Sequence, residues 1–177
     1  KTAYEVPRSL GGSEMGIRDR DNHHSQHGNS IESEIQDWFK TIAYGIIFLI
    51  EKGHPGLFHG EYHGIEGKTS PHKLIIDILL DARRKYAYGE QNYYFDHPNT
   101  IGFTRMGDEE HPGSGLAVLI SNSEDGYKIM NVGPNRKGET WREITGSISE
   151  EVTIDENGDG KFMVKGSKLA VWAQKTV

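Results

Sequence analysis

The side chains best suited to chemistry lie early in the chain, in the stretch Asp21-Asn22-His23-His24, with His27 three residues further on. Imidazole groups three or four residues apart can converge on a zinc ion. A metal site is therefore one interpretation of these histidines. The spacing supplies no carboxylate or further ligand, however, and histidines of an ordinary polar loop are the alternative. The residues that follow have to decide between them.

A second candidate is the stretch Asp155-Glu156-Asn157-Gly158-Asp159-Gly160, which has the acidic and amide spacing that opens a calcium-binding EF-hand. Such a loop needs a glutamate at its twelfth position, where this chain has Gly166, and it needs a helix on each side. The flanking residues here predict strands instead. We therefore interpret the stretch as a hairpin turn and assign no metal ligand in the chain.

Composition limits the classes of function. The chain has 177 residues, of which 34% are hydrophobic, and a formal net charge of -6, which suits one ordinary domain or two small ones. No clustered basic residues indicate a nucleic-acid partner. The longest apolar run, residues 42–50, is far shorter than the roughly 20 residues that span a bilayer, so no membrane partner is predicted. The absence of cysteine excludes disulfides and thiolate metal sites.

Two helices are predicted in the first half of the chain. Residues 31–52 carry apolar side chains at helical spacing, and Gly53 and Pro55 end the pattern. Residues 71–86 form the second helix, opened by Ser70 and Pro71. Its expected core side consists of Leu74, Ile75, Ile78, Leu79 and Ala82. Between the helices, residues 56–60 predict a short buried strand, and helix, strand and helix together indicate an α/β fragment.

After Gly89 the pattern changes to short apolar or alternating runs separated by turn residues, which is typical of an antiparallel sandwich or barrel. Strands are expected near Tyr93–Phe95, Ile101–Arg105, Leu116–Ser121, Lys128–Val132, Thr140–Thr145, Val152–Ile154, Phe162–Val164 and Leu169–Ala173. Trp141 and Trp172 fall within these runs. If exposed they could stack on sugars, but alternation along a strand favours a place in the core.

Several stretches resemble one family in collinear order. They are Trp38-Phe39-Lys40, Phe58-His59-Gly60-Glu61-Tyr62-His63-Gly64, Asp81-Ala82-Arg83-Arg84-Lys85-Tyr86-Ala87-Tyr88-Gly89, Tyr94-Phe95-Asp96-His97-Pro98, Ile101-Gly102-Phe103-Thr104-Arg105 and Gly138-Glu139-Thr140-Trp141-Arg142-Glu143-Ile144-Thr145-Gly146. The chain thereby resembles the bacterial α-amylases of the liquefying and cytoplasmic types, from about Asp21 to Ala173.

The resemblance implies a fold with two parts. Residues 21–88 would be the last units of a (β/α)8 catalytic barrel, and residues 89–177 an antiparallel β-sandwich C-terminal domain. Residues 1–20 match neither part, and we expect them to be a disordered or artefactual segment. Because a complete barrel takes roughly 250 residues, the chain would hold only a C-terminal fragment of such an enzyme.

The resemblance also gives the first stretch a role. In the family, a barrel strand ends in Asn-His-Asp, and the histidine and aspartate contact hydroxyls of the sugar being cleaved. Asn22 and His23 match that motif, whereas His24 stands where the family has its aspartate. A carboxylate accepts several hydrogen bonds and neutral imidazole accepts one, so His24 is a poor substitute. Asn22, His23 and His24 are our predicted substrate-binding residues.

The function implied is hydrolysis of internal α-1,4-glucosidic bonds in starch- or glycogen-type glucans by the parent enzyme. Retaining glycosidases need a carboxylate nucleophile and a carboxylic acid, and no Asp or Glu here can be assigned either role. We therefore expect the isolated chain to be inactive. The alternative is a non-catalytic carbohydrate-binding or interdomain support module, for which the β domain would suffice.

Calcium and location follow from the same resemblance. Calcium is expected in the parent enzyme, where some relatives bind it between barrel and C-terminal domain through aspartates. The matching positions here are Asn99 and Asn122, whose neutral amides bind calcium less strongly than carboxylates. This makes an interdomain calcium doubtful and favours the cytoplasmic type of enzyme, with a secreted enzyme as the alternative.

Overall fold

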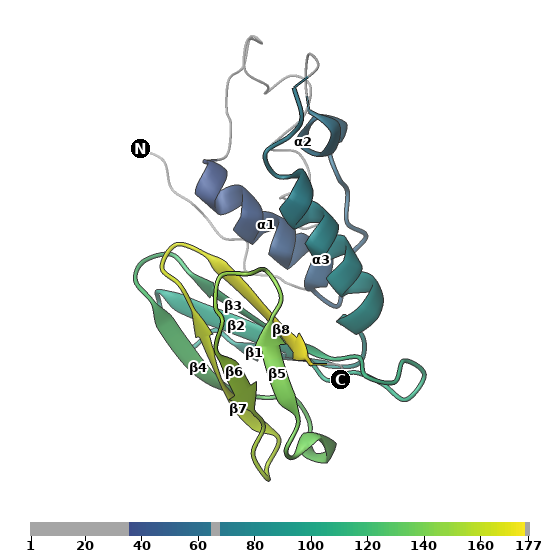
Figure 1. Ribbon diagram of the computed structural model, residues 1–177, viewed down its shortest axis with the longest axis vertical. Coiled ribbons are helices and arrows are strands. Elements are labelled where there is room, and N and C mark those ends of the chain that lie inside the picture. The colour runs from purple at the N-terminus through teal and green to yellow at the C-terminus, as the bar shows by residue number, and fades with distance from the viewer. Residues whose placement is uncertain (1–35, 65–67, 176–177) are drawn as a thin grey trace.

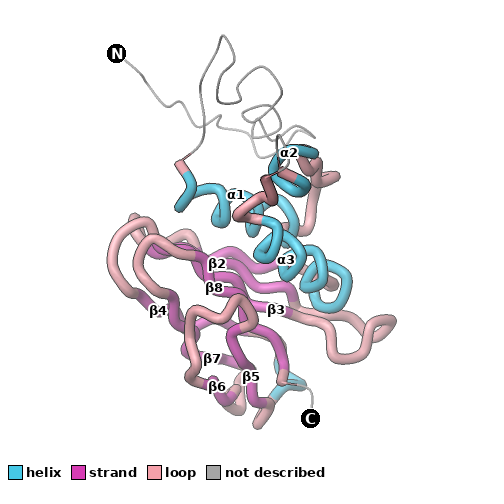
Figure 2. The backbone as a smooth tube through the Cα atoms, turned by 45° about the horizontal axis from the view of Figure 1, so that its top comes forward, coloured by secondary structure: helices cyan, strands magenta, loops and turns pink. Residues whose placement is uncertain are grey.

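The computed structural model describes residues 36–64 and 68–175, and its elements form three layers (Figure 1). The first layer is helical, with α1 (Asp37–Leu49), α2 (His59–His63) and α3 (Lys73–Tyr86). The second and third layers are antiparallel sheets, which lie beneath the helices in Figure 2. Their strands are β1 (Gln91–Tyr94), β2 (Thr100–Arg105), β3 (Leu116–Ser121), β4 (Gly126–Asn131), β5 (Thr140–Glu143), β6 (Glu151–Thr153), β7 (Asp159–Val164) and β8 (Leu169–Gln174), with a short 3₁₀ helix at Pro134–Arg136.

All eight strands predicted from the sequence are confirmed. Six of them form one sheet in the order β1-β2-β3-β8-β5-β6, and β4 and β7 pair as a separate two-stranded sheet. Every pairing is antiparallel. Strand β8 comes last in the sequence yet lies between β3 and β5, so the last strand of the chain holds the middle of the larger sheet.

The larger sheet is covered on both faces. Leu116, Val118 and Ile120 of β3 point towards the helices, where they join a core that includes Phe48 of α1 and Leu79 of α3. Alternate residues of the same strand point the other way. Ala117 and Leu119 pack in a second core with residues of β4 and β7, among them Met130, Phe162 and Val164. Every residue of β3 is consequently buried.

The two tryptophans of the sheet occupy this second core, as predicted. Trp141 and Trp172 are both 0% exposed, and their rings flank Phe162 at centroid distances of 5.7 Å. Each indole N–H has a partner: Trp141 donates to Glu139 Oε2 at 2.9 Å and Trp172 to the Met163 carbonyl at 3.0 Å. Neither ring is available to stack on a sugar.

The first helix is shorter than its apolar pattern. It begins at Asp37, because Gln36 is extended (φ -59°, ψ 137°), and it ends at Leu49, because Ile50 is also extended. The expected residues 31–35 lie outside the described residues. At its end, the Phe48 carbonyl accepts a hydrogen bond from Arg83, and the Leu49 carbonyl accepts one from Arg105. These guanidinium groups satisfy carbonyls that the helix itself leaves unpaired.

Arg105 joins the helical layer to the sheet. It belongs to β2, is buried, and donates to the Gly89 carbonyl through Nε at 3.0 Å and Nη2 at 2.9 Å as well as to Leu49. Burial lowers the pKa of its guanidinium, although the value stays far above neutrality in practice because guanidinium remains protonated in proteins. A buried positive charge at the C-terminal end of α1 is favourable because the helix dipole is negative there.

Two sequence predictions are wrong. Residues 56–60 form no strand; the chain there is irregular until α2 begins at His59. A buried strand of a barrel depends on hydrogen-bonded neighbours, and among residues 36–64 and 68–175 none pairs with this segment. In α3, Leu74 was placed on the core side but is 74% exposed, whereas Ile76 is fully buried. The described neighbours, α1 and the sheet, cover only the Ile76 side of α3.

The stretch 155–160 is a turn, as predicted, but not one that joins paired strands. Asp155 Oδ1 accepts hydrogen bonds from the backbone N–H groups of Asn157 (2.8 Å) and Asp159 (2.9 Å). This is the usual way in which an aspartate nucleates a turn. The turn carries the chain from β6 in the larger sheet to β7 in the smaller one.

The described part of the chain contains no helix that is both long enough and apolar enough to cross a membrane.

The close approach of two glycines between the layers generates a stability prediction. A Cβ atom added at Gly89 (φ +76°) would lie 2.0 Å from the Gly107 carbonyl oxygen, so the backbone would have to move. We expect Gly89→Ala to lower the free energy of unfolding by about 3 kcal/mol or more. Gly138→Ala is the matched control, because Gly138 has φ +79° with nothing within 4 Å. That variant should lose only about 1 kcal/mol. Equal losses in urea melts of the two variants would contradict the steric explanation.

Candidate functional site

The predicted substrate-binding residues Asn22, His23 and His24 lie outside the described residues, as does His27 of the alternative zinc interpretation. Their roles therefore stay predictions. What the structure describes is the part of the chain that follows them, beginning with Gln36 and α1. The polar groups of that part were examined for an arrangement that could bind or transform a ligand.

The most connected polar cluster lies where the three helices meet, and we call it the helix-junction network. Lys40 of α1 is buried, and its Nζ lies 2.9 Å from Glu61 Oε1 of α2. His72, just before α3, places Nε2 at 3.5 Å from Asp37 Oδ1 and 4.0 Å from Glu61 Oε2. Side chains of all three helical segments thus converge on the Glu61 carboxylate.

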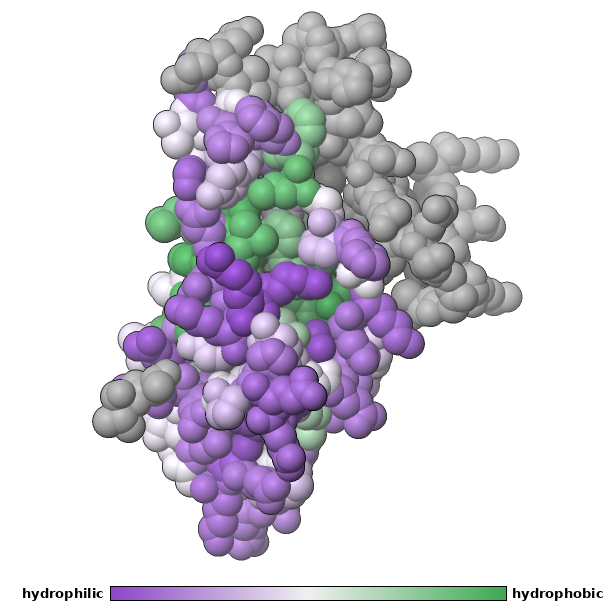
Figure 3. Space-filling model, turned by 90° about the vertical axis from the view of Figure 1, so that its right-hand side faces the viewer, coloured by the Kyte–Doolittle hydropathy of each residue, from purple (hydrophilic) through white to green (hydrophobic). Residues whose placement is uncertain are grey.

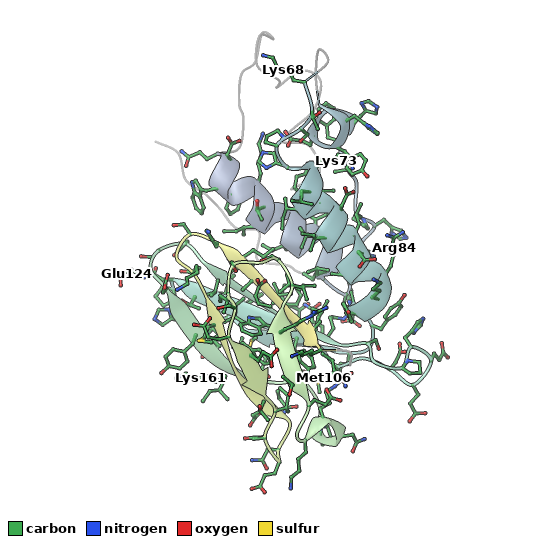
Figure 4. The ribbon with its side chains drawn as sticks, in the orientation of Figure 1. Lys68, Lys73, Arg84, Met106, Glu124 and Lys161 are labelled. Carbon is green, nitrogen blue, oxygen red and sulfur yellow. The ribbon has the colours of Figure 1, made fainter. Side chains whose placement is uncertain are left out.

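A second part of the network fixes α2 to α3. The Tyr62 hydroxyl donates to Asp77 Oδ1 at 2.7 Å, and Lys73 Nζ donates to Asp77 Oδ2 at 2.7 Å and to the Tyr62 oxygen at 3.3 Å. Figure 4 labels Lys73 at the start of α3, below α2. The hydrogen bonds from Lys73 and then from Tyr62 lower the pKa of the Asp77 carboxyl. The same contact with Asp77 raises the pKa of the Lys73 ammonium.

This network positions a helix and is not arranged for catalysis. A retaining glycosidase needs one free carboxylate nucleophile and one carboxylic acid across the scissile bond. Here the carboxylates of Glu61 and Asp77 are each held by a lysine. Sequence analysis did not find the network. Lys40 was the available signal, because it interrupts a helix face that is otherwise apolar.

Glu143 is a buried carboxylate with a comparable structural duty. Its Oε1 accepts from the Thr145 N–H, the Thr145 hydroxyl and the Val171 N–H, and its Oε2 accepts from the Ser147 N–H, at 2.6–3.0 Å. Four donors satisfy the charge that burial would otherwise penalise. The carboxylate thereby fixes the turn after β5 against β8. Sequence analysis did not single out Glu143, because no local pattern marks a buried glutamate.

The positions named for calcium do come together, but they do not fit the ion. Asn122 donates its backbone N–H to the Asn99 carbonyl at 3.1 Å, and both side chains are exposed. They offer neutral amides, whereas calcium affinity depends strongly on the number of carboxylates. Within residues 36–64 and 68–175 no group of three or more His, Cys, Asp or Glu side chains could hold a metal. We derive no metal chemistry at this place.

Two shallow hollows remain. One, of about 360 Å³, lies between the helices and the larger sheet; its lining residues are Trp38, Thr41, Ile75, Thr145, Gly146, Ser147, Ser167, Lys168 and Leu169. The other, of about 220 Å³, lies against the smaller sheet; its lining residues are Asp125, Gly126, Tyr127, Ile148, Glu150, Lys161, Met163, Val164 and Lys165. The first combines an indole with hydroxyl groups, and the second is lined by charged side chains.

The helix-junction network generates a pH prediction. Because the pKa of Asp77 is lowered on folding, its contribution to stability is present above its ordinary pKa of 3.8 and is lost as pH falls through the folded value. Asp77→Asn should therefore lower the urea midpoint at pH 6 but not at pH 2. Asp81→Asn is the control on the same helix, since Asp81 pairs only within α3, with Lys85 and Arg84. A deficit of Asp77→Asn that is equally large at both pH values would contradict the assignment.

Comparison with known proteins places these features in a family. Residues 116–173, from β3 to β8, match the α-amylase C-terminal domain. Over 156 residues the chain is 45% identical to a glucan 1,4-alpha-maltohexaosidase of Bacillus sp. (strain 707). It is 44% identical over 159 residues to an α-amylase of Bacillus licheniformis, and 37% identical over 167 residues to a cytoplasmic α-amylase of Escherichia coli (strain K12). Each alignment covers 88% of this chain but only 30–33% of the relative.

Solved structures support the fold. An alternansucrase in complex with isomaltononaose matches with a TM-score of 0.63 at 15% identity, over 77% of this chain and 16% of that one. An α-amylase from Malbranchea cinnamomea matches with a TM-score of 0.59 at 10% identity, over 78% of this chain and 33% of that one. At such identities the likeness concerns the fold alone. The sequence matches carry the relationship further: the chain corresponds to a C-terminal portion of the bacterial α-amylases, with their C-terminal domain at residues 116–173.

Proposed function

We propose that the chain is the C-terminal portion of an α-amylase-like enzyme that hydrolyses internal α-1,4-glucosidic bonds of starch- or glycogen-type glucans. The observation that carries this proposal is the identity of 44–45% to a maltohexaosidase and an α-amylase along 88% of the chain. Since the chain spans about a third of the length of these relatives, the activity belongs to the longer parent.

We further propose that residues 21–88 are the last units of the parent's (β/α)8 barrel and residues 89–177 its C-terminal domain. The helical layer supports this because it leaves large apolar side chains exposed, namely Trp38, Phe39 and Leu74. Figure 3 shows hydrophobic residues gathered over the helical half of the molecule and hydrophilic ones over the sheet half. Exposed apolar area of this kind marks an interface, and earlier barrel units would cover it.

In that parent, Asn22 and His23 would contact the sugar, and His24 would occupy the position of a transition-state carboxylate. An oxocarbenium-like transition state develops positive charge. A carboxylate there accepts several hydrogen bonds from the sugar and opposes that charge, whereas imidazole does neither well. The two catalytic carboxylates would come from barrel strands earlier in the parent. The described residues would hold the final helices and the C-terminal domain against that barrel.

Calcium binding by the parent, and a cytoplasmic location for it, remain parts of the proposal. The location rests on Asn99 and Asn122 and on the likeness to the cytoplasmic α-amylase of Escherichia coli. Loss of starch hydrolysis on treating the parent with a chelator would support the calcium. Fractionation of the source cells would test the location.

A second candidate function is a non-catalytic module that binds glucan or supports a neighbouring domain. It is favoured by the second core, whose buried residues all come from residues 117–172 of the sheets and their loops and need no helix. Dye-labelled starch separates the candidates. The isolated chain should release no dye, because it lacks an assignable nucleophile and acid. Turnover by the isolated chain would contradict the proposed function.

The role of His24 can be tested in a chimera. The part of the Bacillus licheniformis α-amylase that precedes the matching region would be joined to this chain at Asp21. We expect His24→Asp to raise kcat on starch by about 10²- to 10³-fold, the usual effect of one preorganised electrostatic group. His27→Asp, a neighbouring histidine outside the Asn-His motif, is the matched control and should change kcat little. Equal rates with His24 and with His24→Asp would refute the assignment.

A further inference from the structure

The larger hollow, called here the Trp38 hollow, is built by four separate segments. Trp38 and Thr41 come from the first turns of α1, and Ile75 comes from α3. The turn after β5 contributes residues 145–147, and the β7–β8 turn contributes residues 167–169. Its volume of about 360 Å³ falls within the range of small-molecule sites. It lies far along the chain from the predicted sugar contacts Asn22 and His23, and no role has been assigned to it above.

Trp38 supplies an apolar surface that is held in place. It is 45% exposed, unlike the other two tryptophans of the chain. Its indole N–H donates to Gln36 Oε1 at 2.7 Å, and the Phe39 ring meets it edge-on at 5.6 Å. Both contacts use the edge of the indole. A ring fixed at its edge costs little conformational entropy when a ligand covers its face.

The rim of the hollow is rich in uncharged hydrogen-bonding groups. Thr41, Thr145, Ser147 and Ser167 contribute hydroxyls, and Lys168 is the one charged residue that the described lining contains. Glu143 fixes the turn that carries Thr145 and Ser147, through hydrogen bonds to both backbone N–H groups. The Ser147 hydroxyl oxygen is itself buried and has no hydrogen-bond partner among the described residues. Such an orphaned group in a preorganised turn indicates that a further partner is expected there.

These properties select the chemistry of a ligand. No carboxylate lines the described hollow, so a cationic ligand has no counter-charge. An exposed indole beside several hydroxyl groups suits a neutral molecule that has apolar faces and a hydroxylated edge. A pyranose ring has that construction: its C–H groups can lie on an aromatic ring while its hydroxyls bond to the rim.

The smaller hollow lacks this combination. Its aromatic ring, Tyr127, already has Lys161 Nζ at 4.2 Å from the ring centroid, and Figure 4 labels Lys161 on that sheet. Its Asp125 carboxylate is paired with Lys165 at 2.9 Å. Ligand binding there would have to displace existing interactions. The Trp38 hollow is therefore the better candidate, and Tyr127 provides a matched control.

We propose that the Trp38 hollow is an α-glucan-binding site outside the catalytic centre, at which Trp38 stacks on a glucose ring and the hydroxyls of Thr41, Ser147 and Ser167 bond to the sugar. The choice of an α-linked glucan rests on the proposed function, whereas the preference for a neutral sugar rests on the lining itself. Such a site would hold a polymeric substrate beside the parent enzyme and raise its local concentration at the active site.

The test uses the full chain and its own fluorescence. Because Trp141 and Trp172 are fully buried, quenching by acrylamide reports chiefly on Trp38. We expect maltoheptaose to protect Trp38 from quenching, and cellohexaose and inorganic phosphate to have no such effect. Trp38→Ala should weaken retention of the chain in a starch affinity gel by about tenfold or more, as for a central aromatic anchor. Tyr127→Ala should leave retention unchanged.

The structural and functional alternatives give different results. Circular dichroism melts establish whether Trp38→Ala is folded; if it is not, Trp38→Phe and Ser147→Ala replace it, and each should weaken retention by a smaller factor. Unchanged retention in folded Trp38 and Ser147 variants would overturn the proposal, as would protection by phosphate alone. Starch turnover by the chimera with no glucan binding at Trp38 would refute the site and leave the proposed function intact. Binding that prefers cellohexaose would count against the α-glucan assignment.

Discussion

Burial of β3 and β8 on both faces is the constraint on which the rest of the structure depends. These neighbouring strands form the middle of the larger sheet, and all but the last of their twelve residues are buried. An antiparallel sheet can leave one face in water, but here both faces are apolar. One face therefore requires the helical layer, and the other requires the β4–β7 sheet. Neither cover can be removed without exposing the alternate side chains of the same two strands.

Charged side chains join these layers by satisfying backbone groups. Arg105 donates to carbonyls of α1 and of the β1 approach, and Glu143 accepts from N–H groups of the β5 turn and of β8. In neither case is an oppositely charged side chain the bonded partner. A buried charge is costly unless its hydrogen-bonding capacity is used, and backbone groups at the ends of elements also need partners. Each side chain answers both needs at a junction where regular structure stops.

The eight strands could be predicted from the sequence because alternation and turn residues are local signals. Trp141 and Trp172 were placed correctly in the core for the same reason. The pairing order could not be predicted: nothing local places β8 between β3 and β5. Leu74 and Ile76 both fit a helical stripe, and only the position of α1 and the sheet decides which is buried. Arg105, Glu143 and Lys40 were missed as buried residues because their burial depends on partners far away in the sequence. The predicted sugar contacts at Asn22, His23 and His24 rest on the family motif alone, since they lie outside the described residues.

The segment 56–60 shows how the two ends of the molecule differ. Its apolar residues between glycines have the composition of a barrel strand, yet the described structure gives it no partner and it stays irregular. Strand pairing is not a property of the segment, since the hydrogen bonds that define a strand belong to two segments at once. The sheets, in contrast, contain all the partners that their strands need, and their second core is complete without any helix. Regular structure therefore forms where both partners lie in this chain. The helical layer, with an unpaired strand sequence and exposed apolar side chains, has the features expected of an interface with further polypeptide of the parent.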